Sequence, residues 1–351
     1  MPERPRVAIL AEGLLARQTA KTAIGVIRYA PYPVVAVIDS ARAGSDTAAA
    51  IGVGAGIPVV ASVGEAVARG ATVVLIGTAA PGGRIPDSYR PILADGLRHG
   101  LEIWNGLHER VLDDPALAEA AKRGRGRVRE LREPPSDLDI GGHRTRRAGT
   151  HVVLTVGSDA AVGKMTVALE LVRAIERAGK RAAFVATGQT GIAIAGEGIS
   201  VDAVVADFIA GAAERMVCDA AETAEWVVVE GQGSLTHPGF SGVTLGLLHG
   251  SAPDVLLLCH DASRTEVKGF PGLPIRPLRD LVPLYEGAAT WSRPTGVRVP
   301  VVGIALNTSV LDDHAAARAI GSAATETGLP AADPVREGRA GGDRLAAAVL
   351  S

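Results

Sequence analysis

His151–Thr166, with the sequence HVVLTVGSDAAVGKMT, decides the fold of the second half of the chain. An apolar run typical of a buried parallel strand leads into a loop, and a helical pattern follows over Gly163–Arg177. The standard phosphate-binding loop is G-x-x-x-x-G-K followed by Ser or Thr. Here Gly157 stands one position early, and Met165 separates the lysine from the threonine. The order strand, loop, helix still predicts a phosphate site, with a glycine-rich turn carrying an exposed lysine as the alternative.

Each part of this loop has a physical use. Glycines let backbone N–H groups turn toward phosphate oxygens, and the helix N-terminus adds the positive end of its dipole. Lys164 can reach the outer phosphates, and the Thr166 hydroxyl can hold Mg²⁺. We therefore expect cofactor binding by Gly157, Ser158, Asp159, Val162, Gly163, Lys164, Met165 and Thr166.

A second polar segment follows the apolar run Trp226–Glu230, which reads WVVVE. Ligands of open α/β sheets gather at the carboxyl ends of the strands. Glu230 at such an end predicts a Mg²⁺ ligand or a base, and the alternative is a capping or loop carboxylate. In the next loop, His237 is a candidate acid–base or substrate contact, and the alternative is a structural loop histidine. Lys164, Glu230 and His237 are the candidate catalytic residues.

Other strand ends carry side chains suited to a small polar substrate. Arg264 can clamp a carboxylate with its fork, or it is a surface arginine. Asn307 can meet a nucleotide base, or it is a turn asparagine. The candidate substrate-binding residues are Gly188, Gln189, Thr190, Asp202, Asp207, Gln232, His260 and Arg264. For each of them a purely structural role in a turn or on the surface is the alternative.

Strand-like and helix-like segments alternate along the chain, which predicts an α/β architecture. We expect a Rossmann-like domain over residues 1–120, a basic linker over 121–149, and a P-loop NTPase-like parallel-sheet domain over 150–351. No G-x-G-x-x-G occurs in the first half, so NAD binding there is doubtful. The expected strands are Val7–Leu10, Val34–Ile38, Val73–Ile76, Leu101–Trp104, Val152–Val156, Arg181–Ala186, Trp226–Glu230, Val255–Cys259 and Val301–Leu306.

Composition limits the classes of partner. The 351 residues are 47% hydrophobic and 21% charged, as in globular proteins, with a formal net charge of -2 that disfavours nucleic acid as the main partner. No secretory signal or apolar run of about 18 residues is evident, so we expect no membrane span and a cytoplasmic location. The chain has 43 glycines but only 3% aromatic residues, which predicts an aliphatic core with tight turns.

Several of these motifs together carry a family resemblance. VGSDAAVGKMT, ATGQTGI, VDAVVADFIAG, VEGQGSLTHPGFSGVTLGLLHG and GIALNTS resemble the DUF1611 family, and more closely its D-glutamate N-acetyltransferase branch. The resemblance implies a Rossmann-like domain joined to a P-loop domain, and acetyl transfer from acetyl-CoA to the amino group of D-glutamate or a similar amino acid in amino-acid catabolism. The second half is also similar to dethiobiotin synthetase, which implies that Lys164, Thr166 and Glu230 serve ATP and Mg²⁺ and that Asn307 contacts adenine.

Two enzyme classes therefore remain open, beside a non-catalytic nucleotide-binding regulator. The first is an N-acetyltransferase that uses acetyl-CoA as cofactor. The second is an ATP- and Mg²⁺-dependent ligase or kinase that activates a small carboxylate, which the lysine, hydroxyl and carboxylate set favours. In either case we expect a small-molecule amino acid or carboxylate as partner, and a homo-oligomer.

Overall fold

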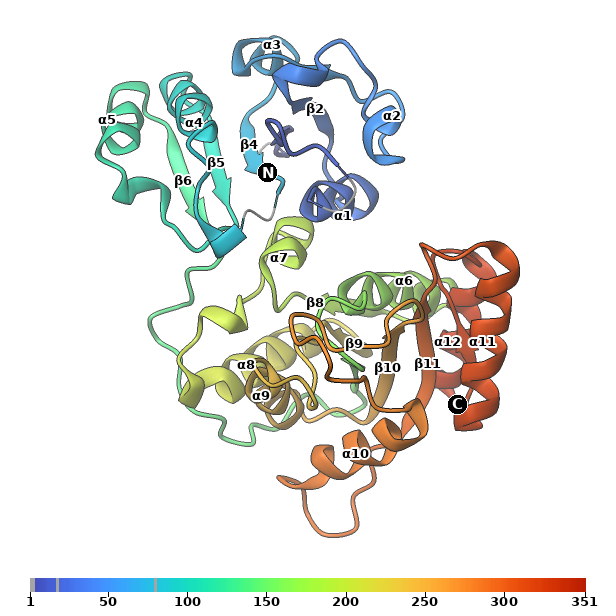
Figure 1. The fold of residues 1–351 in the computed structure, drawn as a ribbon. Coiled ribbons are helices and arrows are strands. Elements are labelled where there is room, and N and C mark those ends of the chain that lie inside the picture. The colour runs from blue at the N-terminus through green and yellow to red at the C-terminus, as the bar shows by residue number, and fades with distance from the viewer. Residues whose placement is uncertain (1–3, 17–18, 79–80) are drawn as a thin grey trace. The chain divides into compact units, whose positions relative to one another are not determined.

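The computed structural model describes residues 4–16, 19–78 and 81–351. The chain divides into two compact units, one formed by residues 1–133 with 192–197 and the other by residues 134–191 with 198–351. Each unit is built around its own six-stranded parallel sheet (Figure 1). The expected α/β fold class, with a parallel sheet in each half of the chain, is confirmed.

The sheet of the first unit has the strand order β3-β2-β1-β4-β5-β6, which is the order of dinucleotide-binding folds. Its strands are β1 (Val7–Leu10), β2 (Val34–Ile38), β3 (Val59–Val60), β4 (Val73–Ile76), β5 (Glu102–Asn105) and β6 (Arg127–Glu130). Its helices are α1 (Lys21–Tyr29), α2 (Thr47–Ile51), α3 (Val63–Ala68), α4 (Tyr89–Arg98) and α5 (Pro115–Gly124). The four expected strands lie within one residue of β1, β2, β4 and β5.

The first unit extends beyond residue 120. Helix α5 continues to Gly124, and β6 pairs in parallel with β5, so this unit reaches Glu133. The expected linker over residues 121–149 therefore begins later in the structure. The sequence of β6, RVRE, carries three charges in four residues and is typical of exposed chain. It can form a strand because β6 is the edge strand of the sheet, where its side chains reach solvent.

The sheet of the second unit has the order β12-β11-β10-β7-β9-β8. Its strands are β7 (His151–Gly157), β8 (Ala182–Val185), β9 (Trp226–Val229), β10 (Val255–Asp261), β11 (Val301–Asn307) and β12 (Ala331–Ala332). Its helices are α6 (Lys164–Arg177), α7 (Gln189–Ala195, whose last residues belong to the first unit), α8 (Ile209–Ala221), α9 (Ser241–Ser251), α10 (Leu278–Thr290), α11 (Asp313–Thr327) and α12 (Arg339–Leu350).

Alternate residues of the second sheet face two different helical layers. Val153, on one face of β7, packs with the apolar sides of α6 and α12. Val152 and Leu154, on the other face, pack with α8, α9 and α10. Burial on both faces explains why these strands read as continuous apolar runs. Since no bulky ring is needed to fill the space between such layers, the core is mainly aliphatic, as the composition predicts.

Glycine is essential on α8 and α9 where the backbone of another segment comes close. A β-carbon at Gly250 would lie 2.0 Å from the carbonyl oxygen of Ala210, and one at Gly211 would lie 1.8 Å from the carbonyl oxygen of Asp139. Both close approaches involve backbone atoms, which cannot move away as a side chain can. The glycine-rich composition therefore serves helix packing as well as turns.

No helix in the described part of the chain is long and apolar enough to cross a membrane.

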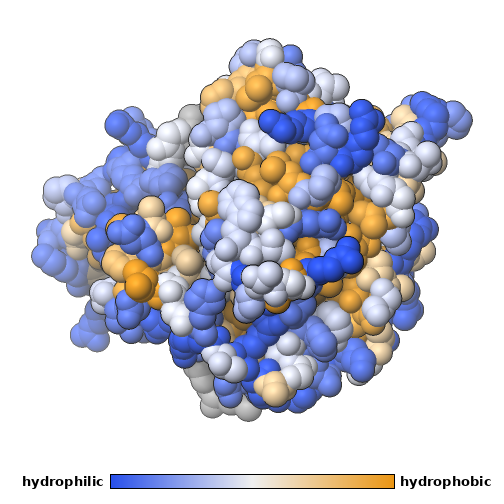
Figure 2. Space-filling view, turned by 90° about the horizontal axis from the view of Figure 1, so that it is seen from below, coloured by the Kyte–Doolittle hydropathy of each residue, from blue (hydrophilic) through white to orange (hydrophobic). Residues whose placement is uncertain are grey.

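Apolar areas lie among hydrophilic ones on the face of the molecule that Figure 2 shows. Trp291, at the end of α10, is 67% exposed, which is high for a large apolar side chain.

We predict that Gly250→Ala lowers the free energy of unfolding by roughly 1–3 kcal/mol, the usual cost of overpacking. Gly242→Ala in the same helix is the matched control, because a β-carbon there meets nothing within 4 Å. Alanine favours helix by up to about 1 kcal/mol over glycine, so the control should be neutral or stabilising. Denaturant unfolding followed by circular dichroism measures both variants, and equal midpoints would contradict the packing argument.

Candidate phosphate-binding site

The loop between β7 and α6 has the backbone of an anion cradle. Gly163, directly before α6, has a φ of 105°, which an L side chain rarely adopts. Gly157 leaves room for the lysine, because a β-carbon there would lie 2.8 Å from Lys164 Nζ. The hydroxyl of Tyr285, from the buried face of α10, donates to the carbonyl oxygen of Gly157 at 2.6 Å. The sequence did not point to this tyrosine, since it lies 128 residues after Gly157, within α10.

Lys164 lies inside the loop with its ammonium group almost out of contact with water. Its Nζ donates to the carbonyl oxygens of Asp159 at 2.9 Å and Gly233 at 2.8 Å. Burial lowers the pKa of Lys164 to about 8, although the nearby carboxylates of Asp159 and Glu230 oppose that shift. The loop therefore holds a poorly solvated cation that an incoming phosphate can pair with, as the lysine motif predicts.

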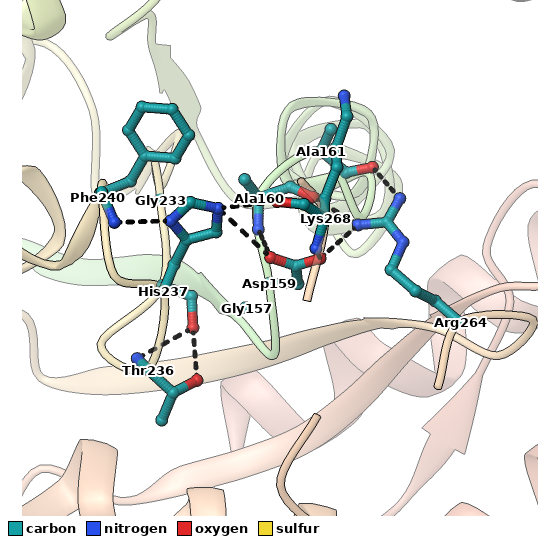
Figure 3. A network of polar contacts seen from close by, with 12 residues as sticks. Gly157, Asp159, Ala160, Ala161, Gly233, Thr236, His237, Phe240, Arg264 and Lys268 are labelled. Carbon is teal, nitrogen blue, oxygen red and sulfur yellow. Dashed lines mark hydrogen bonds and ion pairs between the residues drawn. The ribbon is translucent and has the colours of Figure 1, made fainter. Parts of the chain in front are cut away.

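The carboxylate of Asp159 links the loop to Arg264 and Lys268, as Figure 3 shows. It is fully buried, and its carboxylate accepts from the guanidinium of Arg264 at 2.7 Å and from the backbone N–H of Lys268 at 2.8 Å. Burial alone would raise the pKa of Asp159, but the Lys268 N–H and the Arg264 guanidinium together hold it below its usual value. The side chain thus stays charged, and its bonds to Arg264 and Lys268 hold the loop in place.

In the structure, the guanidinium of Arg264 is hydrogen-bonded to this loop. Besides Asp159, its guanidinium donates to the carbonyl oxygen of Ala160 at 2.7 Å. The expected free clamp for a substrate carboxylate is therefore largely occupied by the protein itself. Arg264 orders the phosphate loop, and its other terminal nitrogen contacts the carbonyl oxygen of Ala161 and the carboxylate of Asp261.

His237 is packed against the same loop and not presented to a ligand. Its Nδ1 accepts from the N–H of Gly239 at 3.0 Å, and its Nε2 contacts the carbonyl oxygen of Lys268 at 3.3 Å (Figure 3). The ring stacks on Phe240 at a centroid distance of 4.4 Å and is 3% exposed. Because both ring nitrogens have partners in the protein, this geometry favours the structural alternative over an acid–base role.

Glu230 follows β9, as expected, and is buried against the turn before α7. Its carboxylate accepts from the N–H of Thr187 at 3.1 Å, and the N–H of Gly188 also stabilises the charge. Burial nevertheless raises the pKa of Glu230 to about 7. A β-carbon at Gly191 would lie 2.4 Å from the carboxylate, so the glycines of the TGQTG segment make room for this group.

These contacts bear on metal binding. The described residues contain no group of three or more His, Cys, Asp and Glu side chains placed to hold a metal ion. Glu230 directs its oxygens at backbone N–H groups, and Thr166 is half-buried at the start of α6. Mg²⁺ often binds through one or two protein oxygens plus phosphates and water, so a role for Thr166 and Glu230 toward it stays a prediction.

The remaining candidate residues fall into two groups. The first group lies near Glu230. The Gln232 amide donates to the carbonyl oxygen of Thr187 at 2.5 Å, Gln189 and Thr190 begin α7, and Asp202 contributes a negative charge.

The second group lies near the lysine loop. Ser158 Oγ lies 2.8 Å from His260 Nδ1, and the Asn307 Cβ lies 4.0 Å from the position that a β-carbon of Gly163 would take. Val162 differs from both, because its side chain packs in the core under α6.

Asp207 has no place in either group. It lies on a short 3₁₀ helix over Ala206–Phe208 and is exposed, while Asp202 lies on another over Val201–Ala203. Val204, which follows the first of these 3₁₀ helices, adopts extended backbone and separates it from the second.

Fold and site together define a two-domain α/β protein with a phosphate-binding loop in its second domain. Family comparison agrees on both halves. A P-loop domain model of unknown function, DUF1611, matches residues 139–345, and its Rossmann-like partner model matches residues 40–134. The chain belongs to the DUF1611 family.

Individual relatives cover most of the chain. Proteins named D-glutamate N-acetyltransferase are 37% identical to it, one from Pseudoalteromonas sp over 79% of this chain and 82% of its own, one from Tritonibacter scottomollicae over 78% and 80%. A crystal structure of a DUF1611 family protein from Anabaena variabilis superposes with a TM-score of 0.89 at 41% identity and covers 99% of each chain.

The raised pKa of Glu230 predicts a pH-dependent stability. Between its unfolded value near 4.5 and its folded value of about 7, the folded protein binds more protons than the unfolded chain. Stability from this group is therefore present below pH 4.5 and lost as pH rises through 7, on the order of 1–3 kcal/mol. Glu230→Gln should lose less stability between pH 5 and pH 8 than the wild type in urea unfolding. Parallel pH profiles of the two proteins would show that Glu230 is not the group responsible.

Proposed function

We propose that the protein is an N-acetyltransferase that moves the acetyl group of acetyl-CoA to the amino group of D-glutamate or a similar amino acid. The observation that carries this proposal is the 37% identity to proteins named D-glutamate N-acetyltransferase over about four fifths of both chains. Since 277 of the 351 residues are matched, the aligned stretch necessarily includes the phosphate loop. By the same resemblance, the reaction would serve amino-acid catabolism.

The loop chemistry supports acetyl-CoA as the second substrate. Acetyl-CoA carries a pyrophosphate and a 3′-phosphate, and a backbone cradle with a buried lysine suits either. The cradle depends on glycine at Gly157 and Gly163, and Lys164 supplies the charge. Binding would exchange the two carbonyl partners of the ammonium group for phosphate oxygens, a stronger charge-assisted pairing.

The second candidate is an ATP- and Mg²⁺-dependent ligase or kinase. Lys164 with Thr166 two residues on and Glu230 at the next strand end is the set that such enzymes use, and this observation favours it. The pairing of the Glu230 carboxylate with the Thr187 N–H weighs in the other direction, because it takes up one of the two oxygens that a metal would use.

A product assay separates the two. We expect the protein with D-glutamate and acetyl-CoA to release free CoA, and the protein with D-glutamate and ATP–Mg²⁺ to release no ADP. ADP release that depends on the amino acid, without CoA release, would replace the acetyltransferase by the ligase or kinase.

Lys164→Ala tests the loop itself. Losing a charged hydrogen bond to phosphate costs about 1.5–3 kcal/mol, so KM for acetyl-CoA should rise roughly tenfold or more. Lys180→Ala is the matched control, since Lys180 is an exposed lysine of the same unit just after α6. We expect the control to keep the wild-type KM. A Lys164→Ala protein with unchanged kinetics would remove the phosphate loop from the mechanism.

The lowered pKa of Lys164 also predicts how acetyl-CoA affinity varies with pH. The ammonium group is charged below its pKa of about 8 and loses its proton above it. The dissociation constant of acetyl-CoA should therefore increase as pH rises from 7.5 to 9.5, by up to roughly tenfold per pH unit. Lys164→Met, which has no charge to lose, should bind more weakly with a flat profile over this range. Equal slopes for both proteins in titration calorimetry would assign the effect to another group.

We also propose a homo-oligomer. Exposed apolar side chains such as Trp291, 67% exposed, and Phe240, 51% exposed, are of the kind that a subunit interface covers.

A further inference from the structure

A pocket of about 390 Å³ opens in the second unit beside the phosphate loop. It lies between the end of β10, the segment before α10, and α11. Its size falls in the lower part of the range for small-molecule sites, roughly 300–1,000 Å³. The sequence did not reveal it, because its walls come from four segments up to 66 residues apart, between His260 and Glu326.

The pocket shares two side chains with the phosphate loop. His260 lines it, and its Nδ1 lies 2.8 Å from the hydroxyl oxygen of Ser158, the second residue of the loop. Arg264 also lines it while its guanidinium holds Asp159. The pocket therefore borders the phosphate loop, as a site for a second substrate must.

Charges of both signs line this pocket without pairing with each other. Arg276 is exposed, and among the described residues no carboxylate forms an ion pair with it. Glu326 accepts one backbone N–H, from Arg279 at 3.2 Å, and has no cationic partner within the described chain. A guanidinium and a carboxylate that have no ion-pair partner in the described chain complement, in one small pocket, the two charges of an amino-acid zwitterion.

The rest of the lining suits the carbon chain of such a ligand. Leu278, Leu306 and Ala323 are buried and provide an apolar wall. His260 is close enough to Glu326 for the carboxylate to affect it electrostatically. A cation held by Glu326 therefore lies in the neighbourhood of the imidazole.

We propose that this pocket binds the amino acid that accepts the acetyl group, with Arg276 on its carboxylate, Glu326 on its ammonium group, and His260 as the base. This inference rests on the proposed function and names the substrate site and base for it. In the tautomer whose Nδ1–H donates to Ser158, Nε2 carries the lone pair. Nδ1 is the ring nitrogen with a partner in the described chain, so Nε2 is the one available to the pocket.

The ammonium group gives one proton to Nε2 of His260, and the freed lone pair on nitrogen attacks the thioester carbon. A C–N bond forms, the C–S bond breaks, and the CoA thiolate leaves with the electrons of that bond. One of the two protons still on the nitrogen goes to the thiolate. The products are the N-acetyl amino acid, the CoA thiol, and one proton that passes from His260 to solvent.

The surroundings of His260 suit a base near neutral pH. Burial lowers the pKa of His260, while Asp261, Glu326 and Asp159 oppose the shift and Arg264 adds to it. The imidazole is therefore neutral at pH 7 and ready to take a proton. His237, in contrast, uses both nitrogens within the protein.

The first experiment measures binding. We expect D-glutamate to bind the full-length protein in titration calorimetry with saturating CoA, and Arg276→Gln to weaken it at least roughly tenfold. Arg279→Gln is the matched control, because Arg279 lies three residues further on and is exposed but does not line the pocket. The control should bind within about twofold of the wild type. Binding of D-glutamate by Arg276→Gln at the wild-type level would overturn the site. So would the absence of binding by the wild type to all of D-glutamate, D-aspartate and L-glutamate.

The second experiment measures CoA release against pH. His260→Gln should lower kcat by roughly 100-fold or more, keep KM for acetyl-CoA, and lose the acidic limb of the wild-type profile. His99→Gln, an exposed histidine of the first unit, should behave as the wild type. A His260→Gln protein with wild-type kcat, or with the acidic limb intact, would overturn the role of the base.

The two experiments keep this inference separate from the proposed function. Amino-acid binding that depends on Arg276, without CoA release, would retain the pocket and reject the acetyltransferase. CoA release with wild-type kinetics in Arg276→Gln would retain the acetyltransferase and reject the pocket.

Discussion

A single buried ammonium group organises the second domain. Lys164 Nζ bonds to the carbonyl oxygens of Asp159, in the loop after β7, and of Gly233, in the loop after β9. It thereby joins the ends of two neighbouring strands and draws the Glu230 carboxylate into the same electrostatic environment. Burying a cation is costly unless it is paired, so the fold must supply these oxygens in fixed places. The glycines, Tyr285 and the strand order all serve that requirement.

A second buried charge completes the arrangement. Asp159 is held by Arg264 and by the N–H of Lys268, both from the chain after β10. The loop is therefore tied on one side to β9 and on the other to β10, which are the neighbours of β7 in the sheet. These bonds fix the shape of the proposed phosphate site, and the pocket with His260 and Arg276 lies at the edge of the same loop.

Much of the fold was accessible from the sequence. Buried parallel strands are apolar along their whole length, so β7, β9, β10 and β11 were predicted within a residue or two at each end. The strands that were not predicted are β3, β6 and β12, two of which have two residues and one of which is highly charged. Such short or polar strands exist because a neighbouring strand offers hydrogen bonds, and local sequence does not record that neighbour.

In the candidate site, too, local features were predicted from the sequence and contacts between distant segments were not. The sequence by itself determined the phosphate loop, Lys164 and the carboxylate Glu230 at the next strand end, because these features depend on residues close together in the chain. Only the tertiary structure decided that Arg264 and His237 are engaged by the loop, and that His260, Arg276 and Glu326 share a pocket. The reason is physical: a local motif sets backbone geometry through its own residues, whereas the partner of a side chain is set by which distant segments the sheet brings to its edge.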